Sequence, residues 1–320
     1  MQLTKELLHE RKQFLYNREY SGNTIRNYTT DVNLFLNYLK LERGIFTLDE
    51  NEITLKNIEG WKTYLKGVPT PKTSIYYTVK PTISSSTIQG KLTAIKSFLK
   101  FMNVIYNTGL DYRKIETKRI KSDYVECITE TEFELLENFI GTYEKYRINA
   151  LRMQLLCNIW YTSGLRLSEM LNLTIDEIKR GECRITGKGN KTRWVFFTPS
   201  TEKLLDNYLK ERWNPIPRTW KVERPSDFVF ISHNSGYDYG KPIKKNTVCE
   251  IMKKYSDALA IWKRITIHCL RHSYATRLLE SGLNIREIQE LLWHCDVKTT
   301  EGYCHILKSW LKSKVNQIFS

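Results

Sequence analysis

The segment HCLRHSYATRLLESG, residues 268–282, places two side chains with complementary chemistry three positions apart. On a helix, His268 and Arg271 share one face. The arginine guanidinium is planar and permanently charged, so it can hold two oxygens of an anion such as a phosphodiester. The histidine gains or loses a proton near neutral pH. Together they predict a site that binds an anion and moves a proton beside it.

A metal site is the competing interpretation of these histidines. His268 and His272 have the i, i+4 spacing of zinc-binding helices, but no Glu follows His268 as the H-E-x-x-H motif requires. We expect His272 to pack or hydrogen-bond within its helix. In LLWHCDVKTTEGYCHI, residues 291–306, eight residues separate Cys295 from Cys304. Structural zinc sites use much shorter Cys spacings, so neither segment predicts a metal, and we expect no cofactor.

Two further segments carry candidate cations. In TSGLRLSEMLNL, Gly164 ends one predicted helix and Arg166 begins the next, where backbone N–H groups favour an anion. Glu169 stands three residues later and can form a salt bridge that orients Arg166. In TGKGNKTR, Lys188 lies between two glycines in a predicted hairpin turn. Taken alone, each of these residues also fits an ordinary surface position.

The elements around these segments are mostly helical. Residues 24–43, with Asn23 as a candidate N-cap, and residues 55–67 and 84–103 have the apolar spacing of helices. Thr129 begins a capping box, and a long apolar helix follows at 147–163. The segments GECRITG and TRWVFFTP predict a β-hairpin, DFVFISH (227–233) predicts a strand, and helices return from about 246. The predicted fold class is mainly α with a small β-sheet.

Charge and length indicate the kind of partner. The chain has 320 residues, which suits two domains, and a net charge of +15. Its partner is therefore expected to be a polyanion, with nucleic acid first and an anionic membrane second. The absence of an apolar run of about 18 residues and the charged N-terminus argue against a membrane. Seven cysteines without CxxC spacing predict reduced thiols and a cytoplasmic protein.

The positive charge is unevenly distributed. From Gly60 to Leu110 the chain has no Asp or Glu. A solvated lysine face would account for a short run of this kind. A stretch this long, mixed with Tyr, Thr and Ser, instead favours a surface that follows DNA phosphates. Its lysines are Lys62, Lys66, Lys72, Lys80, Lys91, Lys96 and Lys100.

Read together, the segments resemble those of a known family. SGLRLSE, GKGNKTR, HCLRHSYATRLLESG, IQELLWH and TTEGYCHI are similar, in order and spacing, to the motifs of the tyrosine recombinases, the phage integrase family. Trp293 stands where the family usually has Gly, and Gly302 where it often has a larger residue; neither departure removes a catalytic group. The residues that match the family's catalytic set are Arg166, Lys188, His268, Arg271, His294 and Tyr303.

The resemblance implies an architecture. Residues 1–112 would form a helical core-binding domain that contacts DNA, residues 113–127 a linker, and residues 128–320 an α+β catalytic domain with a C-terminal docking helix. The two domains would form a C-shaped clamp on DNA. The expected partners are double-stranded DNA with a specific recombination site and a homotetramer, or a heterotetramer with a second recombinase, in which the C-terminal helix docks on a neighbouring protomer.

The resemblance also implies roles. Tyr303 would attack the scissile phosphate to give a 3′-phosphotyrosine, and exchange would pass through a Holliday junction without ATP or metal. Arg166 and Arg271 would bind the non-bridging oxygens, and His268 would act as general acid/base. Lys188 would protonate the departing 5′-oxygen, His294 would hydrogen-bond the phosphate, and Glu169 would support Arg166.

Several functions remain open from the sequence. Within the family, a Xer-like resolvase of chromosome or plasmid dimers competes with an integrase or excisionase of a mobile element. A type IB topoisomerase would share the nucleophile. The segment RLLESGLNIREIQELLWH also resembles a helix-turn-helix with Gly282 in its turn. A regulator of that kind would leave Arg166, Lys188 and Tyr303 without a role. A recombinase would act in the cytoplasm at the nucleoid.

Overall fold

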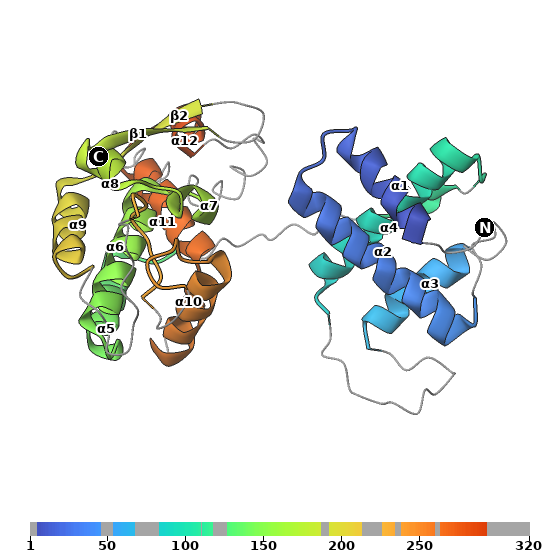
Figure 1. Cartoon of the computed structure of the whole chain (residues 1–320), viewed down its shortest axis with the longest axis horizontal. Helices are drawn as coiled ribbons and strands as arrows, with labels where there is room; N and C mark the ends of the chain where they lie inside the picture. Colours follow the sequence, from blue (N-terminus) through green and yellow to red (C-terminus); the bar gives the residue numbers. More distant parts are fainter. Residues whose placement is uncertain are drawn as a thin grey trace, which may run out of the picture. The chain divides into compact units, whose positions relative to one another are not determined.

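The protein divides into two compact units, Met1–Lys121 and Ser122–Ser320, the N-terminal and the C-terminal unit (Figure 1). A computed structural model gives their structure. It describes residues 5–45, 54–67, 83–109, 111–117, 127–186, 192–212, 226–233, 238–259 and 263–292.

The N-terminal unit is helical. Its helices include those predicted around 24–43, 55–67 and 84–103, which confirms these predictions. The N-cap prediction was wrong: Ser21 Oγ accepts a hydrogen bond from Thr24 N at 3.3 Å, so the helix begins at Gly22 and Asn23 already lies in its first turn. The elements are α1 (Lys5–Tyr16), α2 (Gly22–Arg43), α3 (Leu55–Leu65), α4 (Ser85–Tyr106) and the 3-10 turn η1 (Tyr112–Lys114).

The N-terminal core forms where α2 meets α3 and α4. The rings of Phe35 and Trp61 meet edge to face with 5.1 Å between their centroids, and both side chains are almost fully buried. Leu92 and Ile95 of α4 are buried in the same cluster. Apolar residues at helical spacing therefore hold this unit together.

The C-terminal unit has more helices and one small sheet, as the predicted fold class requires. Thr129 makes the predicted capping box: its hydroxyl accepts from Glu132 N, and the Glu132 carboxylate accepts from Thr129 N at 2.7 Å. The helices are α5 (Glu130–Tyr143), α6 (Arg147–Ser163), α7 (Leu167–Met170), α8 (Ile175–Lys179), α9 (Pro199–Glu211), α10 (Lys245–Leu259), α11 (Ile267–Glu280) and α12 (Ile285–Leu292).

The sheet is the predicted hairpin. Strands β1 (Glu182–Thr186) and β2 (Thr192–Phe196) are antiparallel, with Ile185 opposite Arg193. The strand predicted at 227–233 is wrong, because this segment makes only isolated bridges, with Thr174 and with Pro242. Its backbone pairs with two different segments, so no continuous ladder forms.

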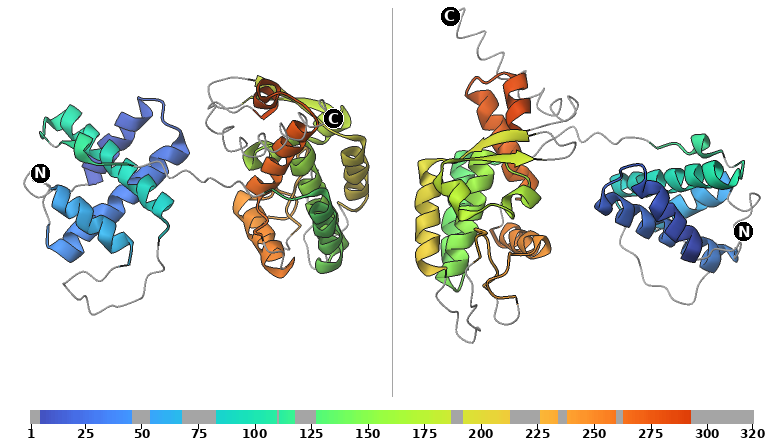
Figure 2. Two further views of the ribbon diagram at one scale, coloured as in Figure 1. Left: turned by 180° about the vertical axis from the view of Figure 1, so that it is seen from behind. Right: turned by 45° about the horizontal axis from the view of Figure 1, so that its top comes forward.

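Helix α6 lies at the centre of the C-terminal unit. Helices α5, α9 and α11 pack against it, and it lies between them in Figure 2. Gly164 ends α6 with a positive φ of 60°. A Cβ at this position would lie 2.9 Å from Leu292 Cδ2 and closer still to Tyr274 Cδ1. Only glycine fits both the backbone conformation and this close packing.

The first described residues of the C-terminal unit are bound to α11 and the loop before it. Ile128 N donates to Ser273 Oγ at 2.8 Å, and Cys127 Sγ lies 3.2 Å from Thr276 Oγ1. The buried Lys263 ammonium donates to Cys127 O at 2.6 Å. We refer to Cys127 and Ile128, the first two described residues of this unit, as the entry segment. In the N-terminal unit, Ile115 is buried in the core.

The helices that the structure describes differ in length and in apolar content. None of them is both long enough and apolar enough to span a bilayer.

We predict that Gly164→Ala destabilises the C-terminal unit more than Gly181→Ala. Both glycines have positive φ values, of 60° and 75°, but a Cβ at Gly181 meets no atom within 4 Å. The left-handed conformation alone costs about 1–2 kcal/mol, and overpacking at Gly164 adds about 1–3 kcal/mol. Urea unfolding of both variants measures the difference. Equal losses would contradict the packing of Gly164 against Tyr274 and Leu292.

Candidate active site

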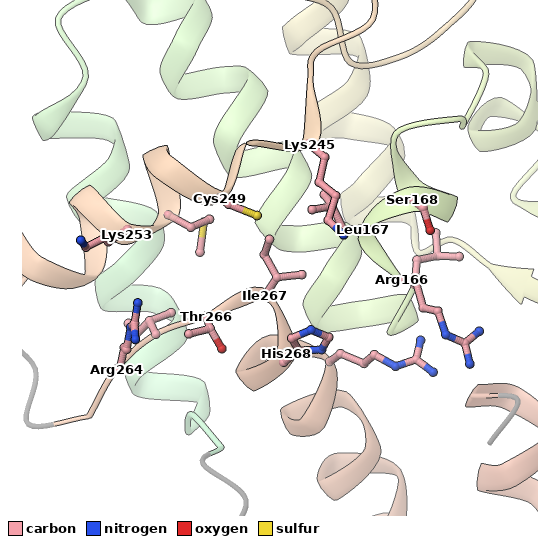
Figure 3. A pocket seen from close by; sticks show the side chains of 14 residues that line it. Arg166, Leu167, Ser168, Lys245, Cys249, Lys253, Arg264, Thr266, Ile267 and His268 are labelled. Carbon is pink, nitrogen blue, oxygen red and sulfur yellow. The ribbon is translucent and has the colours of Figure 1, made fainter. Parts of the chain in front are cut away.

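A pocket of about 380 Å³ in the C-terminal unit brings together three of the predicted catalytic residues. Arg166 comes from the start of α7, and His268 and Arg271 from the first turns of α11. Figure 3 shows Arg166, Lys245 and His268 around the pocket, each carried by a different segment of the chain. The arginine, lysine and histidine side chains that line the pocket are Arg166, Lys245, Lys253, Arg264, His268 and Arg271.

Arg166 is held by Glu169 on the next turn. Its Nη1 donates to Glu169 Oε1 at 2.8 Å, and its backbone N donates to Glu169 Oε2 at 2.8 Å. The predicted anion preference of this helix start is thus met by a carboxylate of the same helix. The Arg166 side chain is still 41% exposed, so part of its guanidinium faces the pocket.

Glu169 has a second arginine partner. Arg193 on β2 donates to Glu169 Oε1 at 3.2 Å and to Oε2 at 2.7 Å, a bidentate contact. The side chains of Arg193 and Glu169 are only 3% and 10% exposed. Burial raises the pKa of the Glu169 carboxyl, but the hydrogen bonds from Arg193 and Arg166 outweigh burial and lower it to about 2. The carboxylate therefore stays ionised at any working pH.

Arg271 lies deeper than Arg166 and is almost fully buried. Its Nη1 donates to the carbonyl of Gly164 at the end of α6, and its Nη2 donates to Leu292 O at the end of α12, at 2.6 Å. One guanidinium thus joins the ends of two helices. Beyond Leu292 the chain leads to His294 and Tyr303.

His268 lies at the start of α11, where Thr266 is the N-cap. Partial burial in the pocket wall, followed by the positive charges of Arg271 and Lys245, lowers the pKa of the imidazole. The ring is therefore neutral at pH 7 and can accept a proton. This is the protonation state that a general base needs.

His272 lies one turn further along α11. Burial, then the charges of His268 and Arg271, lower its pKa to about 4. In the part of the chain that the structure describes, no three His, Cys, Asp or Glu side chains gather as metal ligands do. His272 is half-buried, in keeping with the packing role expected for it.

Three predicted catalytic residues, Lys188, His294 and Tyr303, lie outside the described residues. Lys188 falls between β1 and β2. His294 and Tyr303 follow α12. Of the predicted catalytic and supporting residues, the structure therefore describes Arg166, Arg271, His268 and Glu169.

The predicted DNA-binding lysines differ in their surroundings. Lys91 Nζ lies 2.5 Å from Asp31 Oδ1 in a largely buried ion pair, and Lys96 donates to a backbone carbonyl at 3.1 Å. Lys62 forms a surface ion pair with Glu59 at 3.1 Å. The others are Lys66 and Lys100, which are exposed, and Lys72 and Lys80, which lie outside the described residues.

Two site residues were missed by sequence reasoning. Lys245 lines the pocket together with His268 and begins α10. It lies far before His268 in the sequence, so no local spacing pattern connects the two residues. Arg193 is contained in the GKGNKTR motif, but nothing in the motif indicates its partner. The signal for Arg193 was its inward position in the β2 alternation, where a charged residue requires a buried counter-ion.

Solved structures include a similar fold. The integrase of the Tn1549 transposon in complex with transposon right end DNA matches with a TM-score of 0.66 and 16% identity, covering 98% of this chain and 99% of that chain. At this identity the match concerns the fold alone.

Comparison of the sequence with known proteins extends over nearly the whole chain. It is 29% identical to tyrosine recombinase XerC of Pediococcus pentosaceus over 320 residues, covering 98% of each protein, and 28% identical to tyrosine recombinase XerD of Listeria monocytogenes over 303 residues, covering 94% and 93%. The model of the phage integrase N-terminal SAM-like domain matches residues 12–104. The model of the phage integrase family matches residues 126–309, more than half of the chain. The chain belongs to the phage integrase family.

Proposed function

We propose that the chain is a Xer-type site-specific DNA recombinase that cuts and rejoins strands through a 3′-phosphotyrosine. The observation that carries the proposal is the meeting of Arg166, His268 and Arg271 at one pocket in a chain aligned over 98% of its length with a tyrosine recombinase. It would act on chromosomal or plasmid DNA in the cytoplasm, as a tetramer on two paired sites. The domain limits 1–112, 113–127 and 128–320 are part of the same proposal.

In this proposal the pocket binds the scissile phosphodiester. Arg166 and Arg271 are the cations that would hold its non-bridging oxygens and stabilise the charge that develops on the pentacoordinate phosphorus. Arg166 presents the exposed part of its guanidinium, and Glu169 fixes its direction. His294 would add a hydrogen bond to the phosphate.

The chemical step exchanges one phosphodiester for another. Tyr303 Oη forms a bond to phosphorus as the bond from phosphorus to the 5′-oxygen breaks. His268, neutral at pH 7, accepts the phenol proton, and Lys188 donates a proton to the departing 5′-oxygen. The 5′-hydroxyl of a partner strand then attacks the phosphotyrosine, which reverses these transfers. Because the energy of the broken phosphodiester is retained in the phosphotyrosine bond, this reaction requires no ATP, and none of its steps calls for a metal.

The other functions fit less well. Both named relatives are Xer recombinases aligned end to end, which favours dimer resolution over the integration of a mobile element. Helices α11 and α12 are joined by a short turn, in which Gly282 has a φ of 95°. A regulator, however, has no use for the buried pair of Glu169 and Arg193 beneath Arg166.

The first test is a covalent trap. Wild-type protein incubated with a nicked suicide duplex that carries its site should form an SDS-resistant protein–DNA adduct. Tyr303→Phe removes the nucleophilic oxygen and should abolish the adduct. Tyr143→Phe, a matched change at an exposed tyrosine of α5, should retain it. An adduct formed by Tyr303→Phe would rule out Tyr303 as the nucleophile, and no adduct in the wild type would rule out the function.

The second test is the pH dependence of cleavage. If neutral His268 is the base, the rate falls as pH drops through the lowered pKa of His268, so the acid limb lies below the ordinary value of about 6.5. Lys245→Gln removes a positive charge that lowers this pKa. The acid limb should then move to higher pH in single-turnover cleavage at saturating DNA.

Lys253→Gln is the control for Lys245→Gln. It removes a lysine from the same pocket, but its charge does not contribute to the shift at His268. An unmoved acid limb in Lys245→Gln, or an equal movement in Lys253→Gln, contradicts the assignment of His268 as the base.

The third test concerns the N-terminal unit and salt. Lys100 is exposed, so a phosphate contact at Lys100 would release counterions. Lys100→Gln should then make the slope of log affinity against log salt shallower by about 0.9. Lys91→Gln is the control: it breaks the buried ion pair with Asp31 and should lower stability to urea instead. An unchanged slope in Lys100→Gln removes Lys100 from the DNA contact.

A further inference from the structure

Glu169 holds Arg166 through two contacts, one from the guanidinium and one from the backbone N–H. A carboxylate paired with a single arginine is neutral overall, and such a pair attracts a phosphate weakly. Arg193 changes this balance. With Arg193 on both carboxylate oxygens, the group of three carries a net charge of +1, and Arg166 keeps a positive field toward the pocket.

Arg193 also joins two parts of the site. It lies on β2, five residues after Lys188 in the sequence, and its partner Glu169 lies on α7 beside Arg166. The same strand contacts α12, whose last residue precedes the segment with His294 and Tyr303. The bidentate contact therefore fixes the hairpin that leads to Lys188 against the helix that begins at Arg166.

We propose that Arg193 is a positioning residue for strand cleavage. Through its two bonds to Glu169, it orients Arg166 and fixes the position of the β1–β2 hairpin against α7. The proposal rests on the proposed recombinase function. Arg193 is buried and does not line the pocket, so it acts through Glu169 and not on the phosphate. Its planar fork suits the two oxygens of one carboxylate, a contact that a lysine cannot reproduce.

The test compares variants in single-turnover cleavage of the suicide duplex at saturating DNA, with affinity measured separately by gel shift. Arg193→Met should lower the cleavage rate by about 10- to 100-fold, since small misplacements of catalytic groups have effects of this size. Affinity should change by less than about 3-fold, because the remaining phosphate contacts dominate binding. Arg193→Lys should retain more of the rate than Arg193→Met.

Two controls separate positioning from folding and from loss of charge. Arg184→Met removes an arginine from the same hairpin, on β1, where it is exposed and bonds Thr192 at 2.9 Å; it should cleave at the wild-type rate. The double variant Arg193→Met with Glu169→Gln leaves no buried unpaired carboxylate. If both residues act through one contact, the double variant loses about as much rate as Arg193→Met, and not the product of the two single losses.

The outcomes are distinct. Absence of an adduct in the wild type contradicts the proposed function. An adduct in the wild type together with a wild-type cleavage rate in Arg193→Met overturns the positioning role. Losses that multiply in the double variant also overturn it. If Arg193→Met shows no cooperative unfolding transition in urea, this variant is not folded. The double variant and Arg193→Lys then decide the question by the same comparison of cleavage rates.

Discussion

The C-terminal unit depends on one buried guanidinium, that of Arg271, and on the absence of a side chain at Gly164. Arg271 donates to carbonyls at the ends of α6 and α12, where the last turn of a helix supplies no backbone donor of its own. The close approach of Tyr274 and Leu292 to Gly164 sets the distance between these helix ends. Arg271 is expected to bind phosphate, but its guanidinium also holds two helix ends together. A bound phosphate must therefore share this guanidinium with two backbone carbonyls.

The unit uses the same arginine–carbonyl bond elsewhere. Arg152 donates to Ile231 O at 3.0 Å, and Arg212 donates to Phe228 O, both within the segment that does not form a strand, and to Ser226 O just before it at 2.9 Å. These arginines replace the missing ladder partners. The pocket cations differ in exposure: Lys245 is exposed and Arg166 is partly so. Arg152 and Arg212 therefore support the fold, whereas Arg271, although it is also buried, lines the pocket as well.

The sequence predicted best what local signals specify. The capping box at Thr129, the helix end at Gly164 and the hairpin all arise from neighbouring residues. Short sequence motifs likewise identified Arg166, His268 and Arg271 as candidate catalytic residues. Arg193 could not be assigned, because its partner depends on the hairpin register and on the fold of α7. The strand predicted at 227–233 failed for a related reason: a short run of apolar residues indicates an extended chain but does not specify a partner strand.

The entry segment has a mechanical consequence. Ile128 and Cys127 are bound at Ser273 and Thr276, on successive turns of α11, and Lys263 binds Cys127 just before that helix. The entry segment is therefore fastened to α11 at two positions that follow His268 and Arg271 along the same helix. Two of these bonds reach α11 itself and the third reaches Lys263 before it, so a pull on Cys127 and Ile128 is borne at Ser273, Thr276 and Lys263, and not by the first turn of α11 with His268.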